Sequence, residues 1–428
     1  MVVRGIVARQ RNLELLLLAG SIGFVFLGWK ALQEAAFALP ETDTRIVLQF
    51  AITALAGHLA LRWSCPDAPA QVFGIAMMLA AVGLIFVMRL APAIAVDQAN
   101  WISLGTALMV GTAIAGRRYD MLQRYKYTAA FLAILLLVIT GLFGTEQGGA
   151  RRWITIAGYT VQSTEIIKVA LIVFLAGYLA QEASVLSMPK VRFGGRNYSS
   201  LPYLLPLAGV WLILMVALGL LKDLGTVALL LLLAMAALYV ATGLIRYVIA
   251  GAALLALTGA AGYALFWHTR TRIDTWLNPS DDPLGAGFQT LQSSYAIQAG
   301  GITGEGLGMG NPQVIPAAST DYIFSAIGEE LGLIGALCIV LLFGLLVFAG
   351  MRVSLMARDP FGRMLGATIA LTIGIQALVI IAGNLRLIPT TGVTLPFVSQ
   401  GGSSMLVNLV LVGLLLAIAQ RARSPDQA

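Results

Sequence analysis

Twelve long hydrophobic runs, separated by shorter polar segments, dominate the pattern of residues along the chain. A helix that crosses a bilayer needs roughly 20 mostly apolar residues, and each run reaches about this length. The pattern therefore predicts an all-α polytopic membrane protein with about twelve transmembrane helices. These helices are expected at approximately residues 13–33, 46–63, 71–90, 100–116, 127–145, 165–181, 203–221, 224–244, 246–267, 322–350, 364–384 and 404–420.

One polar segment, residues 268–321, is unusually long for a connection between two such helices. It contains the tandem carboxylates Asp281 and Asp282 and a glycine-rich stretch at residues 300–310. A long loop of this kind is typical of a functional segment rather than a spacer. Its Asn-Pro and Asp-Pro dipeptides are also typical of simple chain reversals, so the loop alone leaves both interpretations open.

Composition and charge place the chain in a membrane. With 59% hydrophobic and 11% charged residues, it cannot form a water-soluble globule with a polar surface. Basic residues favour cytoplasmic segments, and a cytoplasmic N-terminus puts seventeen of the 27 Lys and Arg residues inside and eight outside. We therefore expect a multi-pass protein of the cytoplasmic (plasma) membrane with both termini cytoplasmic and residues 268–321 outside. The net charge of +7 predicts contact with membrane lipids and no nucleic-acid partner.

Cysteine and histidine contribute little chemistry. The two cysteines, Cys65 and Cys338, form no pair or redox motif in the sequence, and the two histidines, His58 and His268, are too few for a zinc site. We expect no tightly bound cofactor, and the sequence does not identify a metal site.

Several polar residues fall on the predicted outer side. Arg151 and Arg152 place two cations at the surface, and Trp153 beside them is typical of an interfacial anchor. The combination could hold a phosphate group next to a lipid. An anchor without any ligand is the alternative.

Glu165 and Lys168 are three residues apart at the start of a predicted helix, so their side chains share a face and can pair. Ionisable groups at membrane depth are costly and often functional. Both a structural ion pair and a role in substrate binding fit this spacing.

Two further outer reversals carry candidate residues. Asp223 follows a break in a long apolar run and is placed to cap the next helix. Arg386 precedes a glycine-rich helix start that includes Ser403, and backbone N–H groups at such a start can receive an anion. Together these residues predict an outward-facing cavity with cations for a diphosphate and an acidic residue.

Seven sequence blocks resemble, in order, the SEDS family (shape, elongation, division and sporulation), which includes RodA and FtsW. The resemblance covers roughly residues 70–421. The blocks are residues 149–154 (Gly-Ala-Arg-Arg-Trp-Ile), 162–168 (Gln-Ser-Thr-Glu and the following lysine), 223–226 (Asp-Leu-Gly-Thr), 278–289, 320–324, 329–332 and 395–404.

The resemblance implies a SEDS-like helical bundle that acts as a peptidoglycan glycosyltransferase. Such an enzyme polymerises lipid II into β-1,4-linked glycan with inversion, releases undecaprenyl diphosphate, and works with a class B penicillin-binding protein in cell elongation or division. The family's essential aspartate maps onto Asp282. The implied contacts to substrate come from Arg151, Arg152, Trp153, Glu165, Lys168, Asp223, Arg386 and Ser403. A divalent cation, Mg²⁺ or Mn²⁺, is a further candidate for stabilising the negative charge of the departing diphosphate.

The resemblance also implies a domain organisation. Members typically have ten spans, so residues 1–69 are expected to be an N-terminal two-helix extension. Residues 70–421 would form the catalytic core, with the extracellular loop at 268–321, and residues 422–428 a cytoplasmic tail. Between the last two predicted helices, members of the family commonly have a small or apolar residue at the position that Arg386 occupies in this chain.

Two other functions also fit these residues. Buried charges in twelve spans would also suit a transporter or lipid II flippase. A scaffold that holds a penicillin-binding protein without catalysis is the third interpretation, and it would not need Asp282.

Overall fold

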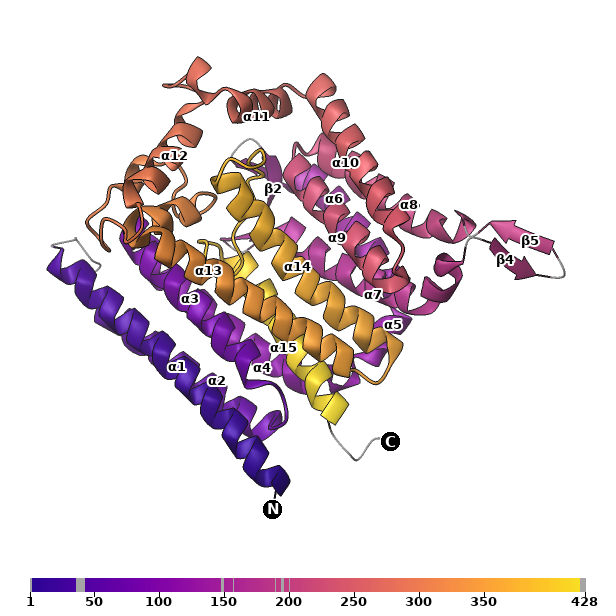
Figure 1. The fold of residues 1–428 in the computed structure, drawn as a ribbon, viewed down its shortest axis with the longest axis horizontal. Helices are drawn as coiled ribbons and strands as arrows, with labels where there is room; N and C mark the ends of the chain where they lie inside the picture. The colour runs from indigo at the N-terminus through magenta and orange to yellow at the C-terminus, as the bar shows by residue number, and fades with distance from the viewer. Residues whose placement is uncertain are drawn as a thin grey trace. The chain divides into compact units, whose positions relative to one another are not determined.

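The computed structural model describes residues 2–35, 43–147, 150–156, 158–188, 190–193, 196–199 and 201–423, so Gly149 of the first family-like block lies outside the described residues. Twelve described helices are long and apolar enough to cross a membrane, which confirms the predicted fold class (Figure 1). They are α1 (Val2–Glu34), α2 (Asp43–Ser64), α3 (Ala70–Leu90), α4 (Ala95–Ala115), α6 (Lys126–Phe143), α7 (Ser163–Ser187), α8 (Leu205–Leu220), α9 (Leu224–Thr242), α10 (Ile245–Leu265), α13 (Ile323–Met356), α14 (Pro360–Asn384) and α15 (Gly402–Arg423).

Shorter elements lie between these helices. Two of them, α11 and α12, give structure to the polar segment that the sequence marks as a functional loop. The short helices are α5 (Asp120–Arg124), α11 (Trp267–Leu277) and α12 (Phe288–Gly300), and the strands are β1 (Thr145–Gln147), β2 (Ala150–Ile156), β3 (Tyr159–Gln162), β4 (Lys190–Phe193) and β5 (Arg196–Ser199).

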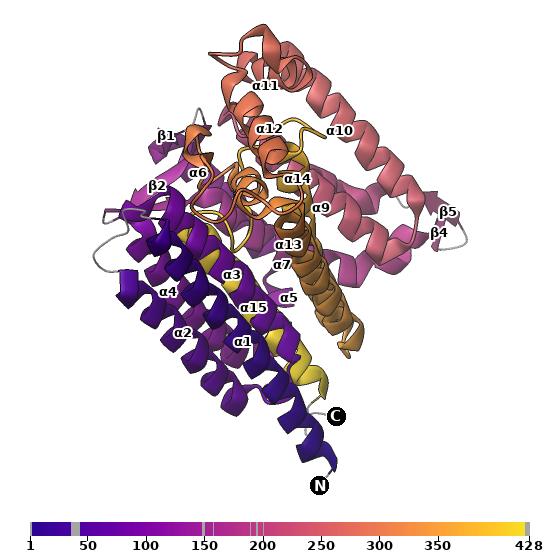
Figure 2. The same ribbon diagram turned by 60° about the vertical axis from the view of Figure 1, so that its left-hand side comes forward.

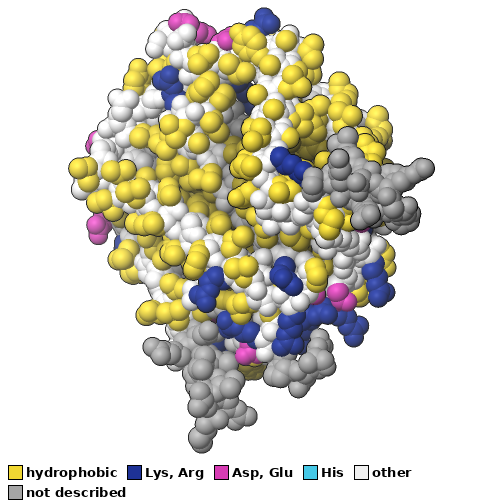
Figure 3. Space-filling view, turned by 45° about the vertical axis from the view of Figure 1, so that its right-hand side comes forward, with side chains coloured by type: hydrophobic (Ala, Val, Ile, Leu, Met, Phe, Trp, Pro, Cys, Tyr) yellow, Lys and Arg dark blue, Asp and Glu magenta, His cyan; other side chains and the backbone are white. Residues whose placement is uncertain are grey.

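The chain forms two compact units. The first unit comprises residues 1–117, 271–352 and 376–428, and the second comprises residues 118–270 and 353–375. In the face shown in Figure 3, hydrophobic side chains are spread over the upper and middle parts, and Lys and Arg side chains gather near the lower end.

The first unit is built around α3. Helices α1 and α4 pack against α3, α2 packs against α1 and α4, and α15 packs against α3 and α4 (Figure 2). Eighteen residues of α3 are buried. Close approach depends on small residues, because a Cβ on Gly83 would lie 2.4 Å from the Val398 carbonyl oxygen.

The two ends of the first unit are identified by hydrogen bonds between its loops. At one end, the Asp67 backbone N–H donates to the Gln420 side chain over 3.0 Å, close to the end of α15. At the other end, the Asn384 side chain donates to the Asp321 carbonyl over 2.8 Å, and the Gln400 N–H donates to the Ser319 carbonyl over 2.9 Å. The long polar segment and the loop after α14 therefore share the end opposite the chain termini.

A break in α13 explains much of the glycine-rich stretch. Gly332 has φ 64° and ψ −167°, inside a helix that is otherwise continuous. The exposed backbone groups on both sides of the break bond to the loop: Glu305 N–H donates to Glu329 O over 2.9 Å, and Leu333 N–H donates to Gly301 O over 2.9 Å. Because lipid offers no hydrogen bonds, a broken helix needs such partners from the protein.

The break predicts a large effect for a small substitution. Gly332→Ala forces a Cβ into a conformation essentially restricted to glycine, at a cost of about 1–3 kcal/mol, and to within 2.3 Å of the Gly304 nitrogen. We expect a lower midpoint of thermal unfolding in detergent. Gly344→Ala in the same helix is the control, since a Cβ there meets nothing within 4 Å. Equal midpoints for the two variants would contradict this account of the break.

The second unit surrounds α7 and carries a small sheet. Helices α6 and α9 pack against α7, and α8 and α10 pack against α9. The sheet is antiparallel with the order β1-β2-β3, and Trp153 pairs with Gln162 across β2 and β3. A separate hairpin joins β4 and β5. The sheet follows α6 directly and leads into α7, so it holds the Arg151-Arg152 segment next to the first turn of that helix.

Candidate functional site

Asp282 lies in a tight turn between a short 3-10 helix and α12. Its two carboxylate oxygens accept hydrogen bonds from the backbone N–H groups of Gly285 (3.0 Å) and Ala286 (2.8 Å). The glycines are required by space: a Cβ on Gly285 would lie 2.2 Å from the carboxylate, and one on Gly287 would lie 1.9 Å from a backbone oxygen. The turn therefore fixes the orientation of an exposed carboxylate.

Helix α12 anchors this turn to the membrane helices. The Ser293 and Ser325 hydroxyls are 2.7 Å apart, and Ser293 also bonds to the Asn384 carbonyl. Asn384 in turn accepts from the Ser325 N–H. Nearby, burial raises the pKa of the Tyr322 phenol, which bonds to Thr290 of α12. These contacts join α12 to α13 and α14, so the base of the Asp282 turn is rigidly supported.

Arg386 ends α14 in a conformation that glycine usually adopts. Its φ is 58°, and the Leu387 N–H bonds to the Ala382 carbonyl as in a glycine-type helix terminus. A side chain there costs roughly 1–2 kcal/mol. The guanidinium donates to the carbonyls of Trp276 (3.1 Å) and Leu277 (3.4 Å) at the end of α11. The predicted phosphate-binding cation is thus also a cap for a helix C-terminus.

Ser403 lies in the first turn of α15 and is half-buried. The glycines before it have a packing role, because a Cβ on Gly402 would lie 2.5 Å from the Trp101 ring. The Gly401 N–H donates to Gln98 over 3.4 Å, and Gln400 accepts from the Ser319 hydroxyl over 2.7 Å. Anion binding at this helix start remains a prediction.

The two arginines of β2 differ in exposure. Arg151 is exposed and donates to the Gly141 carbonyl over 3.1 Å. Arg152 is buried with 9% of its surface accessible. The prediction of two cations at the surface is therefore wrong for Arg152, because consecutive residues of a strand point to opposite faces. Trp153, the predicted interfacial anchor, is half-buried within β2.

Asp223 serves both a helix and an arginine. Its carboxylate accepts from the Thr226 N–H over 3.3 Å and from the Thr226 hydroxyl over 2.8 Å, which confirms the predicted cap of α9. The same carboxylate lies 3.8 Å from the Arg152 guanidinium. The buried Arg152 therefore lies beside a carboxylate of opposite charge.

Glu165 and Lys168 form the predicted pair. The Lys168 ammonium lies 2.6 Å from the Glu165 carboxylate, and both side chains are almost completely buried. With Arg152 and Asp223, the second unit contains two buried cations and two buried carboxylates at the start of α7 and α9. Arg152 and Lys168 therefore each lie beside a carboxylate, and the predicted cationic cavity stays a prediction.

The sequence did not predict one buried ion pair of the first unit. The Arg89 guanidinium at the end of α3 lies 2.9 Å from the Glu330 carboxylate in α13 and donates to the Gly310 carbonyl over 2.8 Å. Glu329 next to it accepts from the Asn311 N–H over 2.7 Å. Each of the two residues is a charged group in or near a hydrophobic run, which is the one sign of a buried pair in the sequence. Because 241 positions separate them, the sequence does not show that they are partners.

The described residues show no cluster of metal-binding side chains. No three His, Cys, Asp or Glu side chains among the described residues lie close enough together to hold a metal ion. Both cysteines are free, and Cys65 is buried.

The residues predicted for the site divide between the units. The first contains Asp282, Arg386 and Ser403, and the second contains Arg151, Arg152, Trp153, Glu165, Lys168 and Asp223.

Sequence comparison finds relatives along nearly the whole chain. A family model for cell cycle proteins of the FtsW, RodA and SpoVE type matches residues 69–424. The chain is 33% identical to the peptidoglycan glycosyltransferase RodA of Mycobacterium tuberculosis, over 97% of this chain and 92% of the relative. It is 39% identical to a probable peptidoglycan glycosyltransferase FtsW of Geobacter metallireducens, over 76% of this chain and 84% of the relative.

Solved structures show the same architecture. One belongs to a peptidoglycan synthase complex that coordinates polymerization and crosslinking; it is 26% identical with a TM-score of 0.64, covering 89% of this chain and 98% of that chain. The crystal structure of the rod shape determining protein RodA of Thermus thermophilus is 23% identical with a TM-score of 0.61, covering 83% and 98%. At that identity the second likeness concerns the fold alone.

Proposed function

The chain belongs to the FtsW, RodA and SpoVE family of cell cycle proteins and is a peptidoglycan glycosyltransferase, and we propose that its substrate is lipid II. The reaction would extend a β-1,4-linked glycan strand and release undecaprenyl diphosphate. The observation that carries this proposal is the identity to mycobacterial RodA over 97% of the chain. A fixed, exposed carboxylate at Asp282 supports it independently.

The proposed step is a single displacement at the anomeric carbon of the donor sugar. The acceptor hydroxyl oxygen forms the new bond to this carbon, and the bond between carbon and diphosphate oxygen breaks. The electron pair of that bond leaves with the diphosphate, and the hydroxyl proton moves to Asp282. A sugar hydroxyl is a poor nucleophile at neutral pH, so a positioned base is needed as the bond forms. Direct displacement inverts the configuration of the carbon.

The cations of the second unit would act on the leaving group. A departing diphosphate gains negative charge, which fixed positive groups stabilise. Arg151 is the exposed member of the set, so we assign it the first contact with the diphosphate. Arg152 and Lys168 are paired with Asp223 and Glu165. Their role would be to share charge with the diphosphate while keeping their carboxylate partners.

The membrane topology supports a reaction on the outer side. If each of the twelve helices crosses once, the connections after α6, α8, α10 and α14 lie on the same side. Every predicted site residue that lies outside a transmembrane helix is in one of these connections. The excess of basic residues in the other connections favours cytoplasmic termini in a bacterial cytoplasmic membrane.

The proposed partners follow from the same comparisons. A class B penicillin-binding protein is supported by the likeness to a complex that couples polymerization to crosslinking. We propose that a divalent cation, Mg²⁺ or Mn²⁺, helps to stabilise the charge of the departing diphosphate.

The test is polymer formation by the purified chain in proteoliposomes that contain labelled lipid II. We expect glycan polymer without any other glycosyltransferase. Movement of the labelled headgroup across the bilayer without polymer would instead identify a flippase. Polymer formation only when an added penicillin-binding protein supplies its own glycosyltransferase would identify a scaffold.

A further inference from the structure

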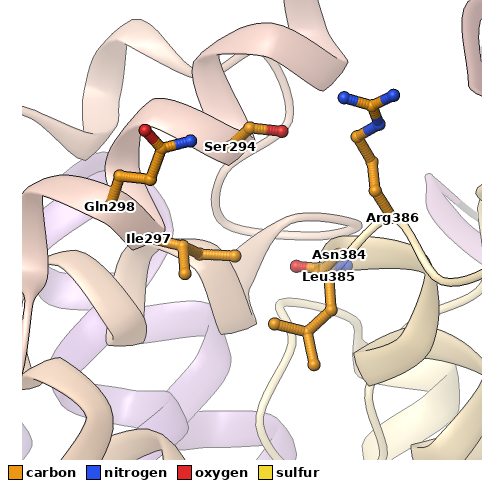
Figure 4. A pocket seen from close by; sticks show the side chains of 6 residues that line it. All are labelled: Ser294, Ile297, Gln298, Asn384, Leu385 and Arg386. Carbon is orange, nitrogen blue, oxygen red and sulfur yellow. The ribbon is translucent and has the colours of Figure 1, made fainter.

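A pocket in the first unit is separate from the Asp282 turn. It has a volume of about 320 Å³ and lies between α12 and the end of α14 (Figure 4). This volume is at the lower end of the range of small-molecule sites, about 300–1,000 Å³. The residues that line it are Ser294, Ile297, Gln298, Asn384, Leu385 and Arg386.

The lining combines apolar surface with groups that form neutral hydrogen bonds. Ile297 and Leu385 lie below Gln298 and Ser294 in Figure 4. The Asn384 side-chain amide already forms hydrogen bonds to α13 and α14, so we assign it no hydrogen bond to a ligand. The Gln298 amide is exposed and offers both a donor and an acceptor. The Ser294 hydroxyl donates to its own helix over 2.9 Å and retains its capacity to accept.

Arg386 is the single charged residue in this lining. Figure 4 shows its guanidinium on the side of the pocket toward which the Ser294 hydroxyl points. Glycine would fit the backbone at this position without strain, since φ is 58°. The chain nevertheless has a long side chain there. Part of the guanidinium is bound to the Trp276 and Leu277 carbonyls, which limits the positive charge it presents to a ligand.

The pocket lies along the helix that continues from the Asp282 turn. Ser294 is six residues beyond Phe288, the first residue of α12, which corresponds to about 9 Å of helix. Gln298 is four residues further, so it follows Ser294 on the same face after about 6 Å. A chain of sugars that starts near Asp282 and follows α12 would place a ring beside these two side chains.

We propose that this pocket is a saccharide subsite that holds one acetamido sugar of the glycan substrate away from the reacting bond. The Gln298 amide pairs with the acetamido group, Ser294 and Arg386 bond to ring or substituent oxygens, and Ile297 and Leu385 contact the apolar face of the ring. A diphosphate fits less well, because the lining offers one partly occupied cation. The assignment rests on the proposed function.

The test compares Ser294→Ala, Gln298→Leu and the double variant with the wild type, as full-length proteins in nanodiscs supplied with lipid II. Loss of one neutral hydrogen bond weakens binding about three- to tenfold. We expect the KM for lipid II to rise by about this factor in each single variant, with kcat nearly unchanged and shorter glycan products. Gln313→Leu, an exposed glutamine outside the pocket, is the matched control and should leave all three quantities unchanged.

Two results would overturn the subsite. One is an unchanged KM and glycan length in both single variants. The other is a fall in kcat with an unchanged KM, since this would place the side chains in the chemical step or its support. Thermal unfolding midpoints of the single variants verify that they are folded, so they decide the outcome even if the double variant is unstable.

Arg386→Gly separates a sugar from a diphosphate as the ligand. For a saccharide, this variant changes KM no more than Gln298→Leu does, and the KM of the wild type depends weakly on salt. If the pocket held the diphosphate, Arg386→Gly would have the largest effect and KM would rise steeply with added salt. That result would contradict the saccharide assignment. Arg386→Lys keeps the charge and serves as the conservative companion.

A binding measurement distinguishes failure of the subsite from failure of the proposed function. The probe is a soluble β-1,4-linked tetramer of N-acetylglucosamine, titrated against the full-length protein. If the wild type makes no polymer, the proposed function fails. Weaker tetramer binding by Gln298→Leu than by Gln313→Leu would still support the subsite, whereas equal binding by the two variants would overturn it.

Discussion

Asp282→Asn is expected to lower kcat/KM for glycan polymerisation by about 10²–10⁴-fold, the usual contribution of a positioned general base. The amide has the shape of the carboxylate but cannot take the proton of the acceptor hydroxyl. Its NH₂ group would also face a backbone donor, because both carboxylate oxygens accept N–H groups from the turn. The measurement is steady-state polymerisation of lipid II, with circular dichroism to verify folding.

Two controls separate the charge of Asp282 from its position. Asp281→Asn removes the neighbouring exposed carboxylate and should leave the rate close to that of the wild type. Gly285→Ala retains the Asp282 carboxylate but places a Cβ 2.2 Å from it, so the turn must shift. We expect this variant to lose activity as well. Equal losses in Asp281→Asn and Asp282→Asn would indicate a general effect of loop charge rather than a base.

Lys168→Met should destabilise the protein by about 3–5 kcal/mol, because it leaves Glu165 buried without its partner. The two charged groups are 2.6 Å apart and their side chains are only 3% and 4% accessible. The double variant Glu165→Gln/Lys168→Met removes both charges and should recover most of this stability. The free energy of unfolding in detergent is the quantity to measure.

The same variants decide between a structural and a catalytic role for the pair. If Lys168 shares charge with the leaving diphosphate, the folded double variant loses about 10²–10³-fold in kcat. Full activity would instead show that the pair only joins helices. Lys222→Met is the matched control, because Lys222 and Glu146 form a half-exposed pair at 3.1 Å. Loss of such a pair costs about 1 kcal/mol or less.

Interactions between neighbours in sequence could be predicted. Glu165 and Lys168 are three residues apart on a helix, and Asp223 caps the turn that contains Thr226, so helix geometry alone defines both contacts. Hydrophobic length similarly identifies the twelve helices. The prolines and glycines around Asp282 predict a turn in the chain at this position. The two N–H groups that hold its carboxylate could not be identified from composition.

Contacts between distant segments could not be predicted. Arg89 and Glu330 are 241 positions apart, and nothing in either segment identifies the other. The burial of Arg152 depends on a strand that places it on the interior face of the small sheet. The glycine-rich stretch near residue 304 is unusual in the sequence, but its packing role depends on the break at Gly332 in α13.

The position of Arg386 illustrates the same limit at a single residue. Its charge suggested an anion site, and charge was the only property visible in the sequence. The backbone conformation with φ 58° and the bonds to the end of α11 depend on how α14 terminates. These features give the residue a structural role and place it at the edge of a pocket.

We expect this chain to join lipid-linked sugars itself, by one displacement assisted by Asp282. The most direct measurement combines the anomeric configuration of the new bond with the amount of polyprenyl diphosphate released by the isolated chain. One diphosphate per new bond, with inverted configuration and with neither product from Asp282→Asn, is the expected result. Retained configuration, or equal product from Asp282→Asn, would contradict the account.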